Sequence, residues 1–294
     1  MNLLLAALFY FFAGLIGIMP FWLIYQFSNF ASFVLGKGIK YRRKVILENL
    51  QQTFPDKPKQ WIDETISKTY LNLSDNLLES FKSFTMLKSS IRKRHKIVNP
   101  ELLDKYIKNK QSVIGVTAHY NNWEWGSLSA GLQTNYNYIA FYKPLSNSII
   151  NKTLKNSRSK CGTKLASIAN TSSTFESYKN EPHIYLMAAD QSPSGTQIKN
   201  ALWFDFLGRD TAFLHGIEKH SRNNNFPVVY IDIQRIKRGY YEVTLQELCD
   251  NPSELTDGEI TERYVRKLED VISKKPENWL WSHRRWKHKR NKGE

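Results

Sequence analysis

From residue 112 onward, short apolar runs alternate with stretches of helical periodicity, and this alternation constrains the fold more than any other feature of the chain. Strands that alternate with helices are typical of a parallel or mixed sheet that is covered by helices. We therefore expect an α/β fold, with a central mixed, partly parallel sheet flanked by helices. The expected strands span 112–117, 136–142, 183–188, 226–235 and 240–245, and the expected helices span 40–53, 58–84, 122–132, 146–160, 212–224 and 260–274.

Two of the expected strands end just before residues that can carry chemistry. His119 follows the first strand and Asp190 follows the third. Ligands of open α/β sheets bind beyond the carboxyl ends of the strands, so both residues are expected at one edge of the sheet. Glu124 stands five residues after His119, and an imidazole with a nearby carboxylate can remove a proton from a hydroxyl. The alternative interpretation of His119 is a capping or core histidine.

The first 36 residues contain no Asp, Glu, Lys or Arg. Residues 3–25, as one helix, would be about 35 Å long and could cross a bilayer core of about 30 Å. A re-entrant or interfacial segment is the alternative, because two glycines and Pro20 can kink the helix. We expect 1–36 to be a membrane anchor and 37–294 to be the remaining domain. A basic cluster follows the apolar run and favours a cytoplasmic location for that domain: Lys37, Lys40, Arg42, Arg43 and Lys44.

The formal net charge of +15 predicts an anionic partner, such as nucleic acid, an anionic membrane surface or a phosphorylated ligand. No zinc-finger, RRM or helix-turn-helix signature is present, so nucleic acid is not favoured. The two cysteines form no CxxC pair and HExxH is absent, so no metal site is predicted. Six Lys or Arg residues lie between His283 and Lys292, which indicates either a solvated tail or a clamp on lipid phosphates.

Several motifs occur in an order that covers nearly the whole chain. They are Arg42-Arg43, Asn49-Leu50, Phe54-Pro55, the run from His119 to Glu124, Tyr142-Lys143-Pro144 with Asn147, Arg158 with Gly162, Asp190-Gln191-Ser192-Pro193, Phe206-Leu207-Gly208, and the run from Pro276 to Lys287. Together they resemble the late-stage lipid A biosynthesis acyltransferases, the Kdo-dependent lauroyl and myristoyl transferases of the lysophospholipid acyltransferase superfamily. Lys143 departs from the pattern, because the family commonly has Arg there.

The resemblance implies an O-acyltransferase at the inner (cytoplasmic) membrane, with its catalytic domain facing the cytoplasm. It implies transfer of a fatty acyl chain from an acyl carrier protein thioester to a hydroxyl of a lipid A precursor, without a cofactor. His119 would be the general base, and Glu124 would hold the imidazole in the required tautomer. The residues implied in substrate binding are Arg158, Asp190, Lys143, Tyr142, Arg284 and Arg285.

Other functions stay open at this point. An acyltransferase of the same superfamily could act on a different glycolipid, phospholipid or aminolipid. A nucleic-acid-binding protein would explain the charge but not the uncharged N-terminus, and a metal-dependent hydrolase could use the same His and Glu. Arg158 could be a solvated helix charge, and Asp190 could pair with Arg158, line the acceptor site or be a turn carboxylate.

Overall fold

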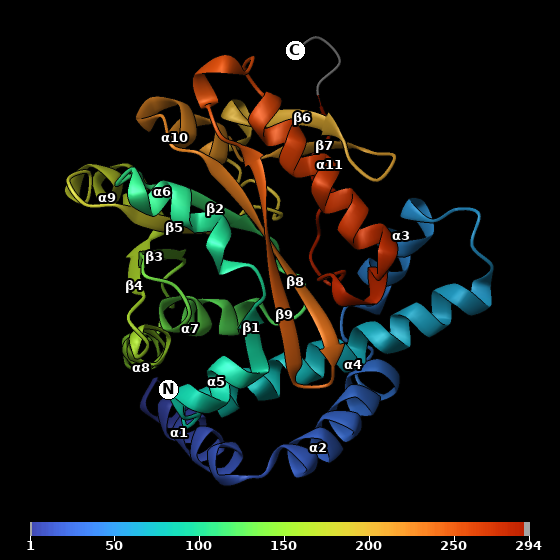
Figure 1. The fold of residues 1–294 in the computed structure, drawn as a ribbon. Helices are drawn as coiled ribbons and strands as arrows, with labels where there is room; N and C mark the ends of the chain where they lie inside the picture. Colours follow the sequence, from blue (N-terminus) through green and yellow to red (C-terminus); the bar gives the residue numbers. More distant parts are fainter. Residues whose placement is uncertain (1, 291–294) are drawn as a thin grey trace.

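A seven-stranded sheet forms the centre of the molecule (Figure 1). The structure is a computed structural model that describes residues 2–290. Only the contact between the last two strands in sequence is antiparallel, and every other pairing in this sheet is parallel. The expected α/β fold with a central mixed, partly parallel sheet is therefore confirmed, and most of its strand pairings are parallel. The strands lie in the order β1 (His95–Ile97), β9 (Tyr240–Cys249), β8 (Val228–Lys237), β2 (Val113–Thr117), β5 (His183–Ala188), β3 (Asn137–Tyr142) and β4 (Lys164–Ser167).

Helices lie on both sides of this sheet, and a small antiparallel sheet lies apart from it (Figure 1). The small sheet pairs β6 (Leu202–Asp205) with β7 (Asp210–Phe213). The helices are α1 (Asn2–Ile18), α2 (Phe21–Phe33), α3 (Arg43–Thr53), α4 (Lys59–Ser83), α5 (Lys88–Arg94), α6 (Asp104–Lys108), α7 (Gly126–Ser129), α8 (Ser148–Ser159), α9 (Thr171–Ser177), α10 (Gly216–Asn224) and α11 (Glu259–Lys274).

The central strands are buried on both faces, which explains their nearly continuous apolar sequences. Successive residues of a strand point to opposite faces, and here they join two separate apolar clusters. Ile184 lies in the cluster that includes Trp125, whereas Tyr185 lies in the cluster that includes α11. The apolar stripe of α11 packs in the cluster that contains Tyr185. Its residues recur every four positions and are wholly buried: Ile260, Tyr264, Leu268 and Ile272.

Two expected helices differ from the observed structure. The segment expected as a helix from 212 begins as the end of β7, and α10 begins only at Gly216. The segment expected as a helix over 122–132 is divided into a 3₁₀ turn (Trp123–Trp125), α7 and a second 3₁₀ turn (Ala130–Leu132). The backbone of Asn121 is left-handed, with φ of 52°, so it turns the chain sharply after the end of β2.

The single helix expected over 3–25 was a wrong prediction, because the chain breaks between α1 and α2 at Met19 and Pro20. Pro20 has extended backbone angles and no N–H to continue the helix. The ammonium of Lys82 on α4 donates to the free carbonyls of Gly17 and Met19, at 2.6 and 2.7 Å. This contact satisfies the C-terminus of α1 and places a cation there, where the helix dipole favours one.

Along one side of the molecule, α1 and α2 follow each other in an arc and pack on α4 (Figure 1). Within residues 2–290, no helix combines the length and the apolar composition needed to cross a bilayer. The division into an anchor at 1–36 and a domain at 37–294 stays a prediction. Residue 1 and residues 291–294 lie outside the described part of the chain, and with them Lys292 of the basic C-terminal segment.

Candidate active site

Two neighbouring parallel strands place His119 and Asp190 beside each other. β2 and β5 are paired in a register that sets Thr117 opposite Ala188, and the amide of Ala189 donates to the carbonyl of Thr117 at 3.1 Å. His119 and Asp190 each follow their strand by two residues. The two side chains therefore meet beyond the carboxyl edge of the sheet, which is where open α/β sheets bind ligands.

The ring of His119 is held between two side chains. Its Nδ1 lies 2.7 Å from Oδ1 of Asp190, and its Nε2 lies 3.1 Å from the amide nitrogen of Gln191. Because Gln191 donates through this nitrogen, Nε2 is the acceptor and the ring proton resides on Nδ1. The indole of Trp279 donates to the other carboxylate oxygen of Asp190 at 2.9 Å. This arrangement fixes the imidazole in the tautomer whose Nε2 can accept a proton.

Opposing effects set the pKa values of this pair. Burial by itself lowers the pKa of His119, but the charge of Asp190, its hydrogen bond and the charge of Glu124 together raise it above its ordinary value. Burial also acts to raise the pKa of Asp190, yet the charge of His119 and the hydrogen bonds from His119 and Trp279 hold it well below its usual range. Asp190 is thus a carboxylate throughout the neutral range, and it stabilises a protonated His119.

Glu124 does not occupy the place expected for it. Among residues 2–290, its hydrogen-bonded partner is Arg158, with contacts of 2.6 to 3.0 Å that engage both carboxylate oxygens. Both side chains are about one quarter exposed, at 26 and 25 %. The prediction that Glu124 orients the imidazole of His119 is corrected accordingly: the orienting contact comes from Asp190. The left-handed turn at Asn121 directs Glu124 toward α8 instead.

A second histidine lies beside this pair. His283 accepts a hydrogen bond at Nε2 from the backbone N–H of Ser192, at 3.1 Å. Burial lowers the pKa of His283 to about 4, against a smaller opposing effect of the charge of Asp190, so its ring is neutral at physiological pH. The contact joins the turn after Asp190 to the C-terminal segment.

Comparison with known proteins decides the family. A family model described as bacterial lipid A biosynthesis acyltransferase matches residues 2–288. The chain belongs to this acyltransferase family. It is also similar to the lipid A biosynthesis lauroyltransferase of Escherichia coli (strain K12), with 22 % identity over 284 residues, which cover 92 % of this chain and 90 % of the relative. The protein is therefore an acyltransferase enzyme of lipid A and lipopolysaccharide biosynthesis.

The other candidate residues of this acyltransferase lie at different distances from the pair. Tyr142 ends β3, the strand beside β5, and Lys143 follows it as an exposed side chain, so both lie on the same edge of the sheet as His119. Arg284 is exposed, but Arg285 is only 2 % exposed. The guanidinium of Arg285 lies 4.2 Å from the ring centre of Phe213, and burial lowers its pKa to about 10. Arg285 is thus packed inside the enzyme rather than on a basic surface.

Sequence reasoning missed three contributors to this site. Trp279 is 3 % exposed, and its indole N–H donates to Asp190. The side-chain amide of Gln191, which the sequence shows only as part of a motif, contacts Nε2 of His119. His283 was counted only as the start of a basic segment. A buried indole N–H and a buried carboxylate both require hydrogen-bond partners. This requirement was the only feature of the sequence that could have predicted the contact of Trp279 with Asp190.

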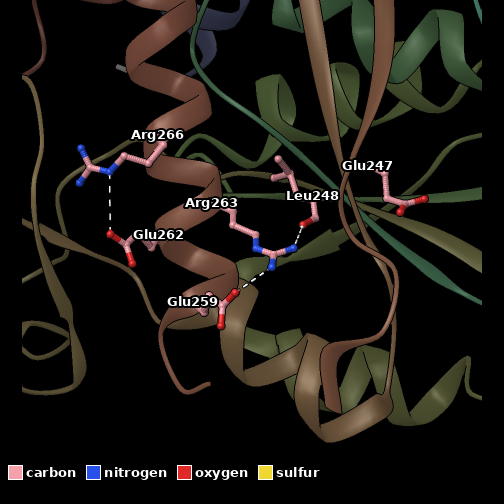
Figure 2. Close-up of a pocket in the computed structure, with 6 residues that line it drawn as sticks. All are labelled: Glu247, Leu248, Glu259, Glu262, Arg263 and Arg266. Atoms are coloured by element: carbon pink, nitrogen blue, oxygen red, sulfur yellow. Dashed lines mark hydrogen bonds and ion pairs between the residues drawn. The ribbon is translucent and has the colours of Figure 1, made fainter. Parts of the chain in front are cut away.

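A surface hollow of about 560 Å³ lies elsewhere, between α11 and the end of β9 (Figure 2). Its arginines are engaged within it: Arg263 binds Glu259 at 2.7 Å, and Arg266 lies 4.0 Å from Glu262. None of the residues that line it contacts His119 or Asp190, so we assign it no part in the chemistry of the acyltransferase. The lining residues are Glu247, Leu248, Glu259, Glu262, Arg263 and Arg266.

Proposed function

We propose that this acyltransferase moves a fatty acyl chain from an acyl carrier protein thioester to a hydroxyl of a lipid A precursor, with His119 as the general base. The family and the lauroyltransferase relative support a lipid A-type acceptor. One observation carries the chemical part of the proposal. Asp190 holds Nδ1 of His119 at 2.7 Å, which leaves Nε2 with a lone pair for the hydroxyl proton.

The proposed reaction needs no nucleophile from the protein. The acceptor hydroxyl replaces Gln191 at Nε2 of His119, gives up its proton there and attacks the thioester carbonyl. The resulting imidazolium is stabilised by the carboxylate of Asp190. When the tetrahedral intermediate collapses, the C–S bond breaks and the thiolate takes the proton from Nε2. The products are the new ester and the free thiol of the carrier, and His119 is neutral again.

Glu124 and Arg158 take a different part in this proposal. A two-oxygen contact with a carboxylate fixes the planar guanidinium in one orientation. The ion pair is partly exposed, and the charge of Glu124 acts to raise the pKa of His119. We propose that Glu124 positions Arg158, and that Arg158 stabilises either the developing oxyanion or an acceptor phosphate.

The exposed apolar surface of α1 and α2 supports association with the inner membrane, with the catalytic domain in the cytoplasm. We propose that both helices lie in the lipid interface rather than across the bilayer, because their apolar side chains are exposed along their length. Exposed cations follow directly at Lys37, Lys40, Arg42 and Lys44 and complement anionic headgroups. Within α1 and α2, the most exposed apolar residues are Leu3, Leu4, Phe11, Ile18, Trp22, Phe30 and Phe33.

The proposed reaction is tested with detergent-extracted enzyme, EDTA, an acyl carrier protein thioester and a tetra-acylated lipid A precursor. We expect a product that is heavier by one acyl chain, measured by mass spectrometry. Parallel reactions offer a phospholipid and an aminolipid in place of the precursor. Product in one of those reactions alone would move the function to the other acceptor class, and activity that requires added metal would favour a hydrolase.

The membrane proposal predicts weaker binding when the apolar surface is made polar. Trp22→Ser combined with Phe30→Ser is expected to lower the partition coefficient on vesicles containing anionic lipid at least about tenfold. Burial of one large apolar side chain contributes about 1.5–3 kcal/mol, and 1.4 kcal/mol corresponds to a factor of ten. The measurement is co-sedimentation with vesicles.

The matched control is Val98→Ser combined with Ile168→Ser, which changes two exposed apolar residues away from α1 and α2. It is expected to bind vesicles as the unsubstituted protein does. Equal binding by all three proteins would place the lipid contact on another surface.

A further inference from the structure

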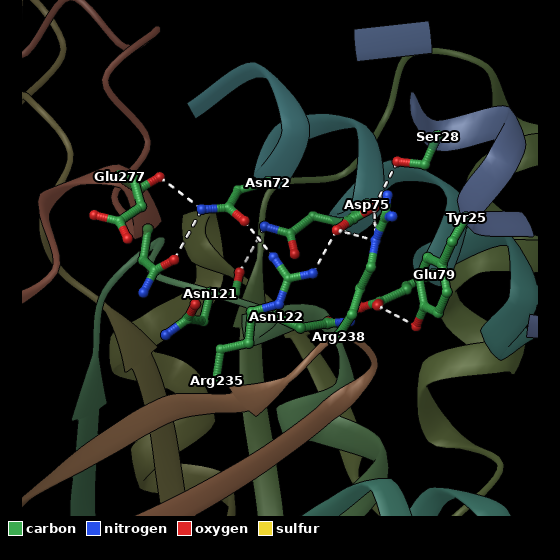
Figure 3. Close-up of polar contacts among 12 residues, drawn as sticks. Tyr25, Ser28, Asn72, Asp75, Glu79, Asn121, Asn122, Arg235, Arg238 and Glu277 are labelled. Atoms are coloured by element: carbon green, nitrogen blue, oxygen red, sulfur yellow. Dashed lines mark hydrogen bonds and ion pairs between the residues drawn. The ribbon is translucent and has the colours of Figure 1, made fainter. Parts of the chain in front are cut away.

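Four polar side chains recur at helical spacing along helix α4: Asn72 and Asn76 are half-buried, and Asp75 and Glu79 are buried. Figure 3 shows Asn72, Asp75 and Glu79 with their partners. Asp75 and Glu79 are both wholly buried. A buried carboxylate is costly unless it is paired and hydrogen-bonded, so its contacts reveal its role. We call these four residues the polar stripe.

The two acids of the polar stripe are satisfied differently. Asp75 binds Arg235 and Arg238 of the β8–β9 hairpin and accepts from the hydroxyl of Ser28, so it is neutralised by cations. Glu79 has no cation as a partner among residues 2–290. It accepts instead from three neutral donors, Tyr25 at 2.8 Å, Tyr241 at 2.8 Å and Asn122 at 2.6 Å.

The contact of Glu79 with Asn122 reaches the chain segment that carries the candidate catalytic residues. Asn122 lies between His119 and Glu124 and is wholly buried. Its side-chain oxygen accepts from the backbone N–H of Trp125 at 3.1 Å, so its amide nitrogen must face Glu79. The carbonyl of the preceding residue, Asn121, accepts from Asn76 of the same stripe at 2.7 Å.

We propose that Glu79 is a positioning residue for acyl transfer, which acts through Asn122 to hold the turn that joins His119 to Glu124. The proposal rests on the function proposed above for His119. Both ends of the contact are inaccessible to water, so the amide of Asn122 has no alternative partner when the acceptor is removed. The turn can then relax only by moving residues 120–124, and a shift of about 1 Å at a reacting group can cost about a hundredfold in rate.

Glu79→Met removes the acceptor and keeps much of the side-chain volume. We expect kcat to fall at least about tenfold, with KM for the acyl donor and for the lipid acceptor within about twofold, because the base is displaced while substrate contacts remain. Glu79→Gln is expected to stay within about threefold. Its carbonyl can face Asn122 and Tyr241, while its NH₂ faces the hydroxyl of Tyr25, which can accept.

A paired exchange tests the contact itself and does not depend on folding of the Met variant. Asn122→Asp sets two carboxylates against each other, and we expect kcat to fall at least about tenfold. Glu79→Gln in that background can turn its NH₂ toward the new carboxylate. We expect it to recover most of the lost rate, which additive, independent effects could not do.

Glu218→Met is the matched control. Glu218 is also wholly buried and accepts three hydrogen bonds, from Arg222 and from the N–H and hydroxyl of Thr261, but it has no contact with residues 119–124. We expect it to lower the thermal midpoint while kcat per folded molecule stays within about twofold.

Two results would overturn the inference while product still forms in the unsubstituted enzyme. One is an unchanged kcat in folded Glu79→Met, and the other is an Asn122→Asp defect that persists in full when Glu79 is replaced by Gln. Absence of product from the unsubstituted enzyme, or full activity in His119→Ala, would instead overturn the proposed function. The two failures are therefore distinguished in one set of assays.

Discussion

His119→Ala is expected to lower kcat/KM for acyl transfer by about 10²- to 10⁴-fold, the usual contribution of a positioned general base. The imidazole is 20 % exposed and its Nε2 faces a side-chain amide rather than the core, so a substrate hydroxyl can replace that amide. Removing the ring leaves the buried carboxylate of Asp190 with the indole of Trp279 as a donor but without its contact to the imidazole. The measurement is the initial rate of ester formation at saturating acyl carrier protein thioester.

The control for this variant is His183→Ala. His183 begins β5, the strand that Asp190 follows, and is itself wholly buried. It is expected to lose stability but to keep its rate per folded molecule, because it lies at the opposite end of the strand from the site. A His119→Ala enzyme that stays within about threefold of the original rate would remove His119 from the chemistry and leave another base to be found.

The sequence was sufficient to locate the edge of the sheet where this chemistry is proposed. Apolar, β-branched runs predicted β2 and β5, and in a parallel pair the residues after such runs are neighbours. His119 and Asp190 could be placed together on that basis. Their hydrogen bond could not be predicted, because strand register depends on which positions pair across the sheet and not on either strand alone.

The partner of Glu124 depends on one backbone angle. A continuous helix from 122 would have carried Glu124 along a regular path, but Asn121 adopts a left-handed conformation and a 3₁₀ turn follows. The five-residue spacing between His119 and Glu124 therefore does not predict where the side chain of Glu124 points after such a turn. Composition alone is equally insufficient for Arg285. A basic run predicts a solvated surface, whereas the guanidinium of Arg285 packs against the rings of Phe206 and Phe213.

The sequence indicates that a helix can end at Pro20, but it does not indicate how α1 and α2 are arranged after the break. Pro20 stops a helix from its own chemistry. The direction taken afterwards depends on contacts with α4. Lys82 donates to the carbonyls of Gly17 and Met19, and the hydroxyl of Thr85, just beyond α4, donates to Gly17 at 2.8 Å. Hydropathy along the chain contains no information about these contacts, so a run of sufficient apolar length predicts one helix where the structure has two.

Asp190→Asn is expected to lower kcat/KM by about 10²- to 10⁴-fold, with a cause that is specific to this site. Trp279 can only donate, so the oxygen of the introduced amide must face it, and the NH₂ group then faces Nδ1 of His119. A donor at that position requires Nδ1 to accept, which moves the ring proton to Nε2. The nitrogen that must take the hydroxyl proton is then already protonated.

The orientation imposed by Trp279 can be relieved, which gives this explanation its sharpest test. Asp190→Asn combined with Trp279→Phe removes the donor, so that the introduced amide can turn its oxygen toward His119 and restore the active tautomer. We expect the double variant to be faster than Asp190→Asn alone, although Trp279→Phe by itself costs stability. A double variant as slow as the single one would show that the charge of Asp190, rather than the tautomer, limits the rate.

The pH dependence of the rate distinguishes the effect of Asp190 on His119 from the effect of Glu124. The base must be neutral, so the rate rises with pH through the raised pKa of His119. Without the charge of Asp190, burial dominates, and the rise in the pH–rate profile should move to lower pH even as the plateau falls. Glu124→Gln removes a charge but no hydrogen bond to the ring, so we expect a smaller shift in the same direction and a loss of about tenfold or more. If Glu124→Gln proved the more damaging of the two, Glu124 rather than Asp190 would be the carboxylate on which the imidazole depends.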